Sequence, residues 1–139
     1  MSRTKALLLD LDGVVYLGPR LLPGVARAIR ALRARGLKVL FVTNNGNRSR
    51  AGFAHKLTRM GVPCATRELM NAAWAAARWP RRRHPRGTRF YVFGRSGLAT
   101  ELEAVGYHAV TVHTRRDWER FRAAPPRIAG VVVNFDISL

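Results

Sequence analysis

The 139-residue sequence is poor in cysteine, in acidic residues and in long apolar runs, and each shortage excludes a class of protein. Cys64 is the only cysteine, so no intrachain disulfide can form. No histidine or acidic residue stands beside it to activate the thiol, which we therefore expect to be inert. The apolar run at residues 6–9 is too short for a signal peptide, and no stretch approaches membrane-spanning length. We expect a soluble, cytoplasmic protein with no membrane partner.

The acidic residues number 8 against 25 lysines and arginines, which gives a formal net charge of +17. Nearly all the basic residues are arginines, scattered from Arg3 to Arg127 with one dense run at residues 81–86. A nucleic-acid footprint is a stripe or patch, often with stacking aromatics, whereas scattered charge is typical of solvated helix faces and loops. The pattern argues against a nucleic-acid partner. A non-catalytic module that binds nucleic acid or another polyanion remains the alternative function.

Apolar runs alternate with amphipathic segments along the whole chain. Strands are predicted at residues 5–9, 38–42, 89–93, 108–113 and 130–133. Helices are predicted at residues 23–36, 47–61, 68–79, 97–105 and 117–122. The first two strands and the last are continuously apolar, which is typical of strands buried on both faces of a parallel sheet. The alternation predicts an α/β fold with parallel sheets.

Two carboxylates follow the first predicted strand. Asp10 and Asp12 stand two residues apart where the chain leaves the sheet, so both side chains can lean toward one site. Nearby carboxylates favour a divalent cation, and oxygen ligands with no His or Cys beside them suit Mg²⁺ better than zinc. Taken alone, Asp12 and Gly13 are equally well explained as an ordinary turn.

Thr43 and Asn44 follow the second predicted strand in the same way. Active groups of parallel sheets collect at the carboxyl ends of the strands, so the two pairs should share one crevice if the strands are neighbours. The Thr43 hydroxyl and the Asn44 amide would then hold phosphoryl oxygens. Gly13 would let the backbone turn tightly and offer its N–H to the anion. Each motif alone is weak evidence, and the two together predict an anion-binding crevice.

The segments Asp10-Leu-Asp-Gly-Val-Val-Tyr16 and Thr43-Asn-Asn45 resemble motifs of the haloacid dehalogenase-like (HAD) hydrolase superfamily. The chain looks like its class IIA branch of p-nitrophenyl phosphatases, phosphoglycolate phosphatases and NagD-like phosphatases. The similarity continues through Val92-Phe-Gly94 to Val131-Val-Val-Asn-Phe-Asp136, which resembles the start of an inserted cap. The resemblance implies the N-terminal part of a Rossmann-like core at residues 1–79, an Arg-rich linker at 80–87 and the first part of a C2-type α/β cap at 88–139.

The resemblance also implies roles for the site residues in a Mg²⁺-dependent phosphatase acting on a small phosphorylated metabolite. Asp10 would be the nucleophile that forms an aspartyl-phosphate, and Asp12 would protonate the leaving group and then deprotonate water. The Asp10 carboxylate and the Asp12 backbone carbonyl would bind Mg²⁺. Thr43 and Asn44 would position the phosphoryl group, with backbone amides near Gly13.

The sequence departs from the family pattern at two levels. Locally, Gly46 stands where a small hydroxyl residue or alanine is usual, and Asn134 stands where glycine is usual. More broadly, the family's lysine and Gly-Asp motifs are missing, and none of the three lysines stands where it would replace the first of them. We therefore expect a truncated chain with weak or no turnover. An exposed sheet edge would favour association, as a homo-oligomer or with a partner chain.

Overall fold

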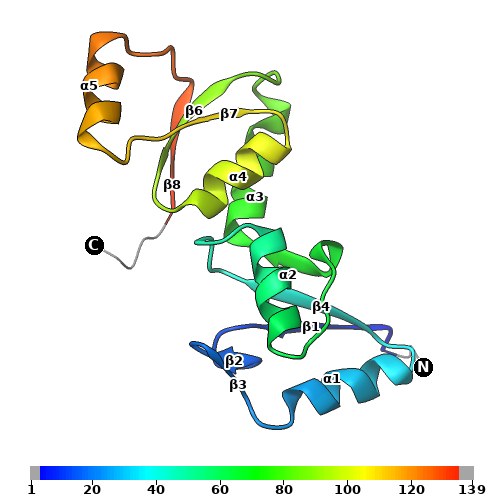
Figure 1. Ribbon diagram of the computed structural model, residues 1–139. Coiled ribbons are helices and arrows are strands. Elements are labelled where there is room, and N and C mark those ends of the chain that lie inside the picture. Colours follow the sequence, from blue (N-terminus) through cyan, green and yellow to red (C-terminus); the bar gives the residue numbers. More distant parts are fainter. Residues whose placement is uncertain (1–3, 135–139) are drawn as a thin grey trace. The chain divides into compact units, whose positions relative to one another are not determined.

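The computed structural model describes residues 4–134 (Figure 1). The chain divides into two compact units, one containing residues up to Asn44 with Arg50–Asn71, the other containing Asn45–Ser49 with residues from Ala72 onward. Each unit has a parallel three-stranded sheet with helices, so the predicted α/β, Rossmann-like class is confirmed. Among the described residues, no helix has both the length and the apolar character needed to cross a membrane.

The first unit is built on a sheet with the strand order β1-β4-β5. Its strands are β1 (Ala6–Asp10), β4 (Lys38–Thr43) and β5 (Leu69–Asn71). Its helices are α1 (Val25–Ala34) and α2 (Arg50–Arg59), with the 3-10 turn η1 (Thr66–Glu68). A small antiparallel hairpin, β2 (Tyr16–Leu17) and β3 (Arg20–Leu21), follows β1 and was not predicted.

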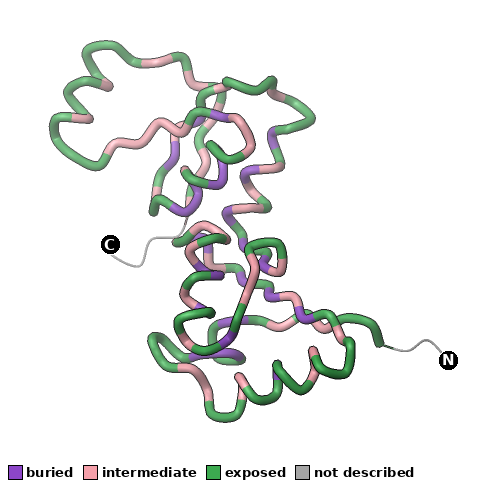
Figure 2. Tube along the Cα trace, turned by 45° about the vertical axis from the view of Figure 1, so that its right-hand side comes forward, coloured by how far each residue is buried: buried purple, intermediate pink, exposed green. Residues whose placement is uncertain are grey.

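The core of this unit lies on one face of its sheet. Val39 and Phe41 of β4 are buried there against Ile29 of α1 and Leu57 of α2. Along β1 and β4, exposed or partly exposed side chains alternate with more deeply buried ones, as Figure 2 shows along the trace. The prediction that the first two strands are buried on both faces is therefore wrong for this structure, because α1 and α2 both pack on the same face. It is also wrong for the last predicted strand, where Val131 and Val133 are exposed.

The helix predicted at residues 68–79 is wrong in its first third. Leu69 and Asn71 of β5 are buried and pair with β4, and helix α3 (Ala72–Arg78) begins only afterwards. A three-residue apolar segment is too short for its periodicity to distinguish a strand from a helix. The pairing partner, which the sequence does not show, decided the conformation.

The second unit has the strand order β7-β6-β8, with all pairs parallel. Its strands are β6 (Arg89–Phe93), β7 (His108–Val110) and β8 (Gly130–Val133). Its helical segments are α3, η2 (Trp79–Arg82), α4 (Ser96–Ala104) and α5 (Arg115–Ala123). Phe90 and Val92 of β6 form a second core with Leu98 and Leu102 of α4.

Helix α5 begins two residues before the predicted start because Thr114 caps it. The Thr114 Oγ1 accepts a hydrogen bond from the backbone N–H of Asp117 at 3.1 Å. The division between the units falls after Asn71, with Asn45–Ser49 also in the second unit, and residues 80–87 contain the end of η2. The assignment of residues 1–79 and 88–139 to a core and a cap stays a prediction. Asp136, part of the cap motif, lies outside the described residues.

Candidate functional site

The predicted site residues follow neighbouring strands of the first sheet. Strands β1 and β4 pair in parallel, with Asp10 opposite Val42, and Thr43 is the next residue of β4. The condition that the two strands are neighbours is therefore met. Asp10 and Thr43 thus lie at the same edge of the sheet, where ligands of open α/β sheets bind.

The two side chains start from opposite faces of that edge. Asp10 is exposed and shares its face with Val42, whereas Thr43 is buried on the covered face, in register with Asn71 of β5. A ligand that touched both Asp10 and Thr43 would therefore have to sit beyond the strand ends rather than on either face. Asn44 is exposed just past the edge. Their use of one common pocket stays a prediction.

The carboxylate of Asp10 is held by the start of the following loop. Its Oδ1 accepts the backbone N–H of Leu11 at 2.7 Å. This hydrogen bond orients the carboxylate through one of its two oxygens. Asp10 is exposed at the end of β1, so its carboxylate is accessible to a ligand from solvent.

The loop after Asp10 is closed by backbone hydrogen bonds. The Leu11 carbonyl accepts the N–H groups of Val15 at 2.9 Å and Tyr16 at 3.1 Å, and Gly13 donates to the Tyr16 carbonyl at 2.8 Å. Gly13 has a φ of 82°, in the left-handed region that favours glycine. Sequence reasoning expected the Gly13 N–H to face an anion, but in this structure that N–H closes the loop. The part that Gly13 plays here is conformational.

Tyr16 contacts Asp12, and Lys56 contacts Tyr16; the sequence gave neither of them a role at the site. The buried Tyr16 donates its hydroxyl to Oδ2 of Asp12 at 3.4 Å, a long hydrogen bond. The Lys56 ammonium lies 3.4 Å from the centroid of the Tyr16 ring. The sequence placed Lys56 in mid-helix without a role. Its position three residues after Phe53, which is buried on α2, was the signal that could have placed it at the rim of the core.

Asn71 is the other polar residue that sequence reasoning missed. It is one of the few buried polar side chains among the described residues and ends β5 beside Thr43. The sequence placed it inside a helix, which concealed its position at a strand end. Buried polar groups at the carboxyl ends of parallel strands are candidates for ligand contact.

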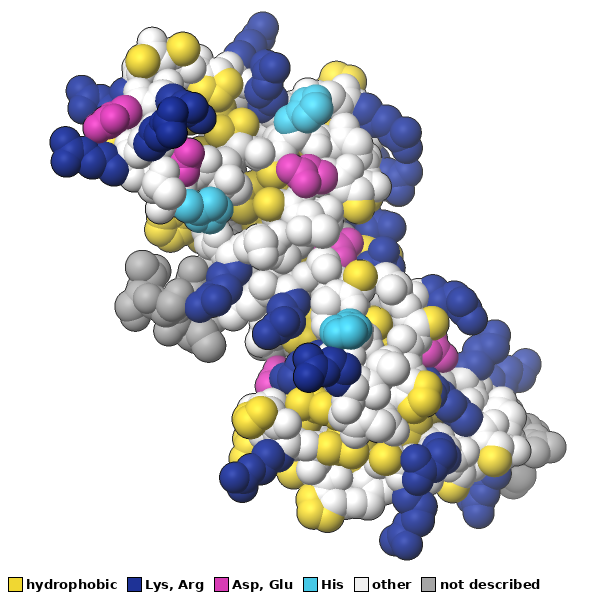
Figure 3. Space-filling model, viewed as in Figure 1, with side chains coloured by type: hydrophobic (Ala, Val, Ile, Leu, Met, Phe, Trp, Pro, Cys, Tyr) yellow, Lys and Arg dark blue, Asp and Glu magenta, His cyan; other side chains and the backbone are white. Residues whose placement is uncertain are grey.

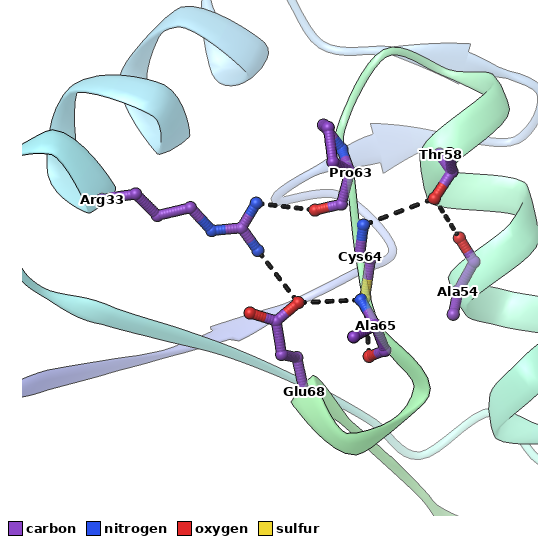
Figure 4. A network of polar contacts seen from close by, with 7 residues as sticks. All are labelled: Arg33, Ala54, Thr58, Pro63, Cys64, Ala65 and Glu68. Atoms are coloured by element: carbon purple, nitrogen blue, oxygen red, sulfur yellow. Dashed lines mark hydrogen bonds and ion pairs between the residues drawn. The ribbon is translucent and has the colours of Figure 1, made fainter.

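Polar contacts hold the segment that leads into β5 (Figure 4). The Arg33 guanidinium of α1 donates to the Pro63 carbonyl at 2.6 Å and to the Glu68 carboxylate at 3.2 Å. The same carboxylate accepts the Ala65 N–H at 2.8 Å. Burial, with a smaller effect of the Glu68 carboxylate, raises the pKa of the nearby Cys64 thiol to about 11, which favours the protonated thiol at neutral pH. The inertness of this thiol stays a prediction.

The fit of Mg²⁺ to the described residues is partial. Asp10 and Asp12 are exposed carboxylates two residues apart. Mg²⁺ is often held by one or two carboxylates while it keeps several waters, so this pair fits part of a magnesium site. Between residues 4 and 134, no group of three or more His, Cys, Asp or Glu side chains could hold a metal ion. The pair is therefore compatible with the ion without forming a complete cage.

On the face drawn in Figure 3, Lys and Arg side chains lie on both units. The expectation that nucleic acid is not a partner stays a prediction. A scattered distribution is what solvated helix faces and loops produce.

Comparisons with known proteins identify the family of this chain. The family model "Haloacid dehalogenase-like hydrolase" matches residues 7–108. Human glycerol-3-phosphate phosphatase is 40% identical over 152 residues, covering 98% of this chain and 46% of that protein. Sugar-phosphatase AraL of Bacillus subtilis is 33% identical over 112 residues, covering 81% of this chain and 41% of that protein.

Solved structures show the same likeness. A hypothetical protein from Pyrococcus horikoshii has a TM-score of 0.78 and 30% identity, covering 97% of this chain and 49% of that one. A 4-nitrophenylphosphatase from Thermotoga maritima has a TM-score of 0.75 and 26% identity, covering 97% of this chain and 46% of that one. A glycerol phosphate phosphatase from Mycobacterium tuberculosis, solved in complex with magnesium, has a TM-score of 0.74 and 27% identity, covering 97% of this chain and 37% of that one.

A parallel α/β sheet with Asp10 and Thr43 at its carboxyl edge, together with these matches, defines the class of protein. The chain belongs to the haloacid dehalogenase-like hydrolase family, in the class IIA branch with the p-nitrophenyl phosphatases and NagD-like proteins. The chain spans about half the length of the glycerol-3-phosphate phosphatases that it matches. Its match covers 46% of the human protein.

Proposed function

We propose that this chain carries the nucleophile half of a Mg²⁺-dependent phosphatase that hydrolyses a small phosphomonoester through an aspartyl-phosphate on Asp10. The observation that supports this most directly is the placement of Asp10 and Thr43 at adjacent strand ends of one parallel sheet. The relatives named as phosphatases of glycerol 3-phosphate and of sugar phosphates support the substrate class. A cytoplasmic location is part of the same proposal.

The chemistry follows from the two carboxylates. The oxygen of Asp10 that is not bonded to the Leu11 N–H attacks phosphorus, forming a carboxyl O–P bond while the ester P–O bond breaks. Asp12 donates its proton to the departing oxygen and the alcohol leaves. Asp12 then takes a proton from a water molecule that attacks phosphorus, which breaks the bond to Asp10 and releases phosphate.

The remaining residues bind and orient the substrate. Asn44, exposed beyond the strand end, donates to a phosphoryl oxygen, and Thr43 supplies a second donor from β4. The Asp10 carboxylate and the Asp12 backbone carbonyl would hold Mg²⁺, which when bound would offset negative charge on the phosphoryl oxygens. The Tyr16 hydroxyl donates a hydrogen bond to the Asp12 carboxylate and helps to orient it.

The test is hydrolysis of p-nitrophenyl phosphate and glycerol 3-phosphate by the purified chain with Mg²⁺. We expect turnover below about 1 s⁻¹, the lower end of common enzyme rates, because the described residues hold only part of a metal site. Whatever rate is found should disappear in Asp10→Asn and persist in Glu103→Gln, an exposed acid of the second unit. Full activity in Asp10→Asn would remove the proposed nucleophile, and turnover well above 1 s⁻¹ would remove the expectation of weak activity.

A further inference from the structure

The chain passes from the first unit to the second directly after a proposed substrate ligand. Asn44 is the last residue of the first unit at this point, and Asn45–Ser49 belong to the second unit. Helix α2, which follows at Arg50, belongs to the first unit again. Because one peptide bond joins Asn44 to Asn45, whatever holds this five-residue segment also fixes the backbone on one side of Asn44.

The segment Asn45–Ser49 is held in the second unit by a close approach to α4. Gly97 lies in the first turn of that helix and is buried. A Cβ atom added at Gly97 would lie 2.5 Å from the carbonyl oxygen of Gly46 and 2.5 Å from the carbonyl carbon of Arg48. Real Cβ atoms do not come that close to other heavy atoms, so only glycine leaves room for the segment at this position of α4.

Space, and not backbone conformation, requires the glycine at position 97. The φ of Gly97 lies outside the left-handed region that favours glycine. Glycine inside a helix is less favourable than alanine, which has a Cβ and fewer unfolded conformations to lose. The close approach of the Arg48 backbone gives the reason for a glycine here.

Two further close approaches involve Asn134, the residue after β8. A Cβ atom at Gly46 would lie 2.6 Å from Oδ1 of Asn134, and one at Gly94 would lie 2.6 Å from its backbone oxygen. The Asn134 N–H donates to the Phe93 carbonyl at 2.8 Å, next to the pairing of β8 with β6. We call Gly46, Gly94, Gly97 and Asn134 the glycine cluster.

A hydrogen bond inside the segment makes it compact. The N–H of Asn47 donates to Oδ1 of Asn45 at 3.0 Å, so the Asn45 side chain binds the backbone two residues further on, as in Asx turns. A compact turn of this kind moves largely as one piece. A displacement imposed on the backbone at Gly46 or Arg48 therefore reaches Asn45 and, through the peptide bond, Asn44.

We propose that Gly97 is a positioning residue for the candidate site: the glycine cluster seats the segment Asn45–Ser49 on α4 and thereby sets the position of Asn44. This role rests on the proposed function, in which Asn44 donates to a phosphoryl oxygen. On its other side Asn44 follows Thr43, which pairs with Asn71 of β5. The sheet and the glycine cluster hold Asn44 from its two sides.

The short range of hydrogen bonds gives a remote glycine its effect. An alanine at position 97 has to move the backbone of Gly46 and Arg48 from 2.5 Å to at least about 3.0 Å, because the atoms that it meets are not the ends of flexible side chains. A shift of this size at Asn44 lengthens or bends its bond to a phosphoryl oxygen. Misplacements of about 1 Å, caused far from the reacting atoms, can lower rates by about 10²-fold.

The first measurement compares Gly97→Ala with Gly130→Ala by NMR of the ¹⁵N-labelled chain. The control makes the same substitution in the same unit, but its Cβ would meet only the Phe90 ring at 3.7 Å, an ordinary contact. We expect the backbone and side-chain amide signals of Asn44 to shift in Gly97→Ala and to stay unchanged in Gly130→Ala. Unchanged Asn44 signals in Gly97→Ala would overturn the role of Gly97, and so would equal shifts in the two variants.

The second measurement is the KM for p-nitrophenyl phosphate in the presence of Mg²⁺. Because we expect slow turnover, KM should approximate the dissociation constant of the substrate. A displaced Asn44 should raise KM about tenfold, the effect of weakening one hydrogen bond to a charged group. A substitution that only destabilises the fold lowers the amount of active chain, so the apparent kcat falls at constant KM. An unchanged KM in Gly97→Ala, with or without a lower kcat, would overturn the positioning role.

A milder substitution provides the test if Gly97→Ala does not fold. The Cβ of Gly46→Ala meets the end of the Asn134 side chain, which can rotate away, so the segment should move less. Asn134→Gly removes that side chain. Gly46→Ala combined with Asn134→Gly should therefore restore the parent's Asn44 side-chain signals and KM. Signals and a KM that stay displaced in the double variant would show that the glycine cluster does not set Asn44.

The two measurements separate this inference from the phosphatase chemistry. Asn44 signals that respond to Gly97→Ala, in a chain that hydrolyses no phosphate ester, would support the control of Asn44 by Gly97 and contradict the proposed function. Hydrolysis that is lost in Asp10→Asn but keeps its KM in Gly97→Ala would support the proposed function and overturn the positioning role. A raised KM together with shifted Asn44 signals would support both.

Discussion

The Lys56 ammonium lies 3.4 Å from the centroid of the Tyr16 ring, and the hydroxyl of that same ring points to Asp12. Helix α2 therefore contacts, through Lys56, the loop that carries Asp12, the proposed acid–base residue. The contact joins two segments that are about forty residues apart in the sequence. It gives this lysine a structural task that its mid-helix position did not suggest.

Replacing Lys56 by methionine should destabilise the fold, because the cation–π contact with the buried Tyr16 is lost. Such contacts contribute about 0.5–2 kcal/mol, depending on how far the cation is desolvated. The measurement is the free energy of unfolding in urea. Lys38→Met is the matched control, since Lys38 is an exposed lysine at the start of β4. Equal effects of the two substitutions would contradict the assigned contact.

The two local departures from the family pattern explain each other. A Cβ atom added at Gly46 would lie 2.6 Å from Oδ1 of Asn134, closer than real Cβ atoms approach. Because the atoms that it would meet belong to the end of the Asn134 side chain, which can rotate away, we expect Gly46→Ala to cost about 1 kcal/mol of stability, the low end of the range for overpacking. Gly46→Ala combined with Asn134→Gly should recover most of that loss.

A double-mutant cycle measures this coupling by thermal or urea unfolding. The coupling energy should be well above the roughly 0.3–0.5 kcal/mol scatter of independent sites. Additive effects of Gly46→Ala and Asn134→Gly would show that the two positions do not share space.

The Cys64 thiol should react slowly with alkylating reagents at neutral pH and faster as the pH approaches 11. Burial raises its pKa to about 11 from 9.0, so the reactive thiolate is scarce in the folded protein. The observable is the alkylation rate between pH 7 and pH 11, compared with the rate of the chain unfolded in urea. Rapid modification of the folded protein at pH 7 would contradict the burial.

The raised pKa of Cys64 makes the free energy of unfolding depend on pH. Because the folded pKa lies above the unfolded value, this contribution is fully present below about pH 9 and is lost as the pH rises toward 11. The alanine variant Cys64→Ala should lack this part of the pH dependence. The measurement is the free energy of unfolding of the parent and of Cys64→Ala at pH 8 and pH 10. It should fall more in the parent than in the variant as the pH rises.

Breaking the ion pair between Arg33 and Glu68 should destabilise the entry into β5. Glu68→Gln weakens the bond to Arg33 and changes the acceptor for the Ala65 N–H. The pair is partly exposed, so we expect a loss of about 1 kcal/mol or less. Glu103→Gln, an exposed acid on α4, is the control and should change stability within about 0.5 kcal/mol. Hydrogen exchange at Leu69 would show whether the loss is local.

Much of the fold was predictable because its signals are local. The apolar runs of β1 and β4, and the glycines that end α1 and α2, mark those elements without reference to anything distant. The short strand β5 was missed because three residues carry no readable period, and only pairing with β4 decides their conformation. Asn71 was missed with it.

The sequence by itself determined the residue types at the candidate site, five of the eight strands of the described residues and the carboxylate pair at Asp10 and Asp12. Tertiary structure alone decided that Lys56 reaches Tyr16, that the Gly13 N–H closes a loop and that Leu8 faces outward. The physical reason is that strand identity depends on side-chain pattern over a few residues, whereas burial and side-chain partners depend on which distant segment packs against each face.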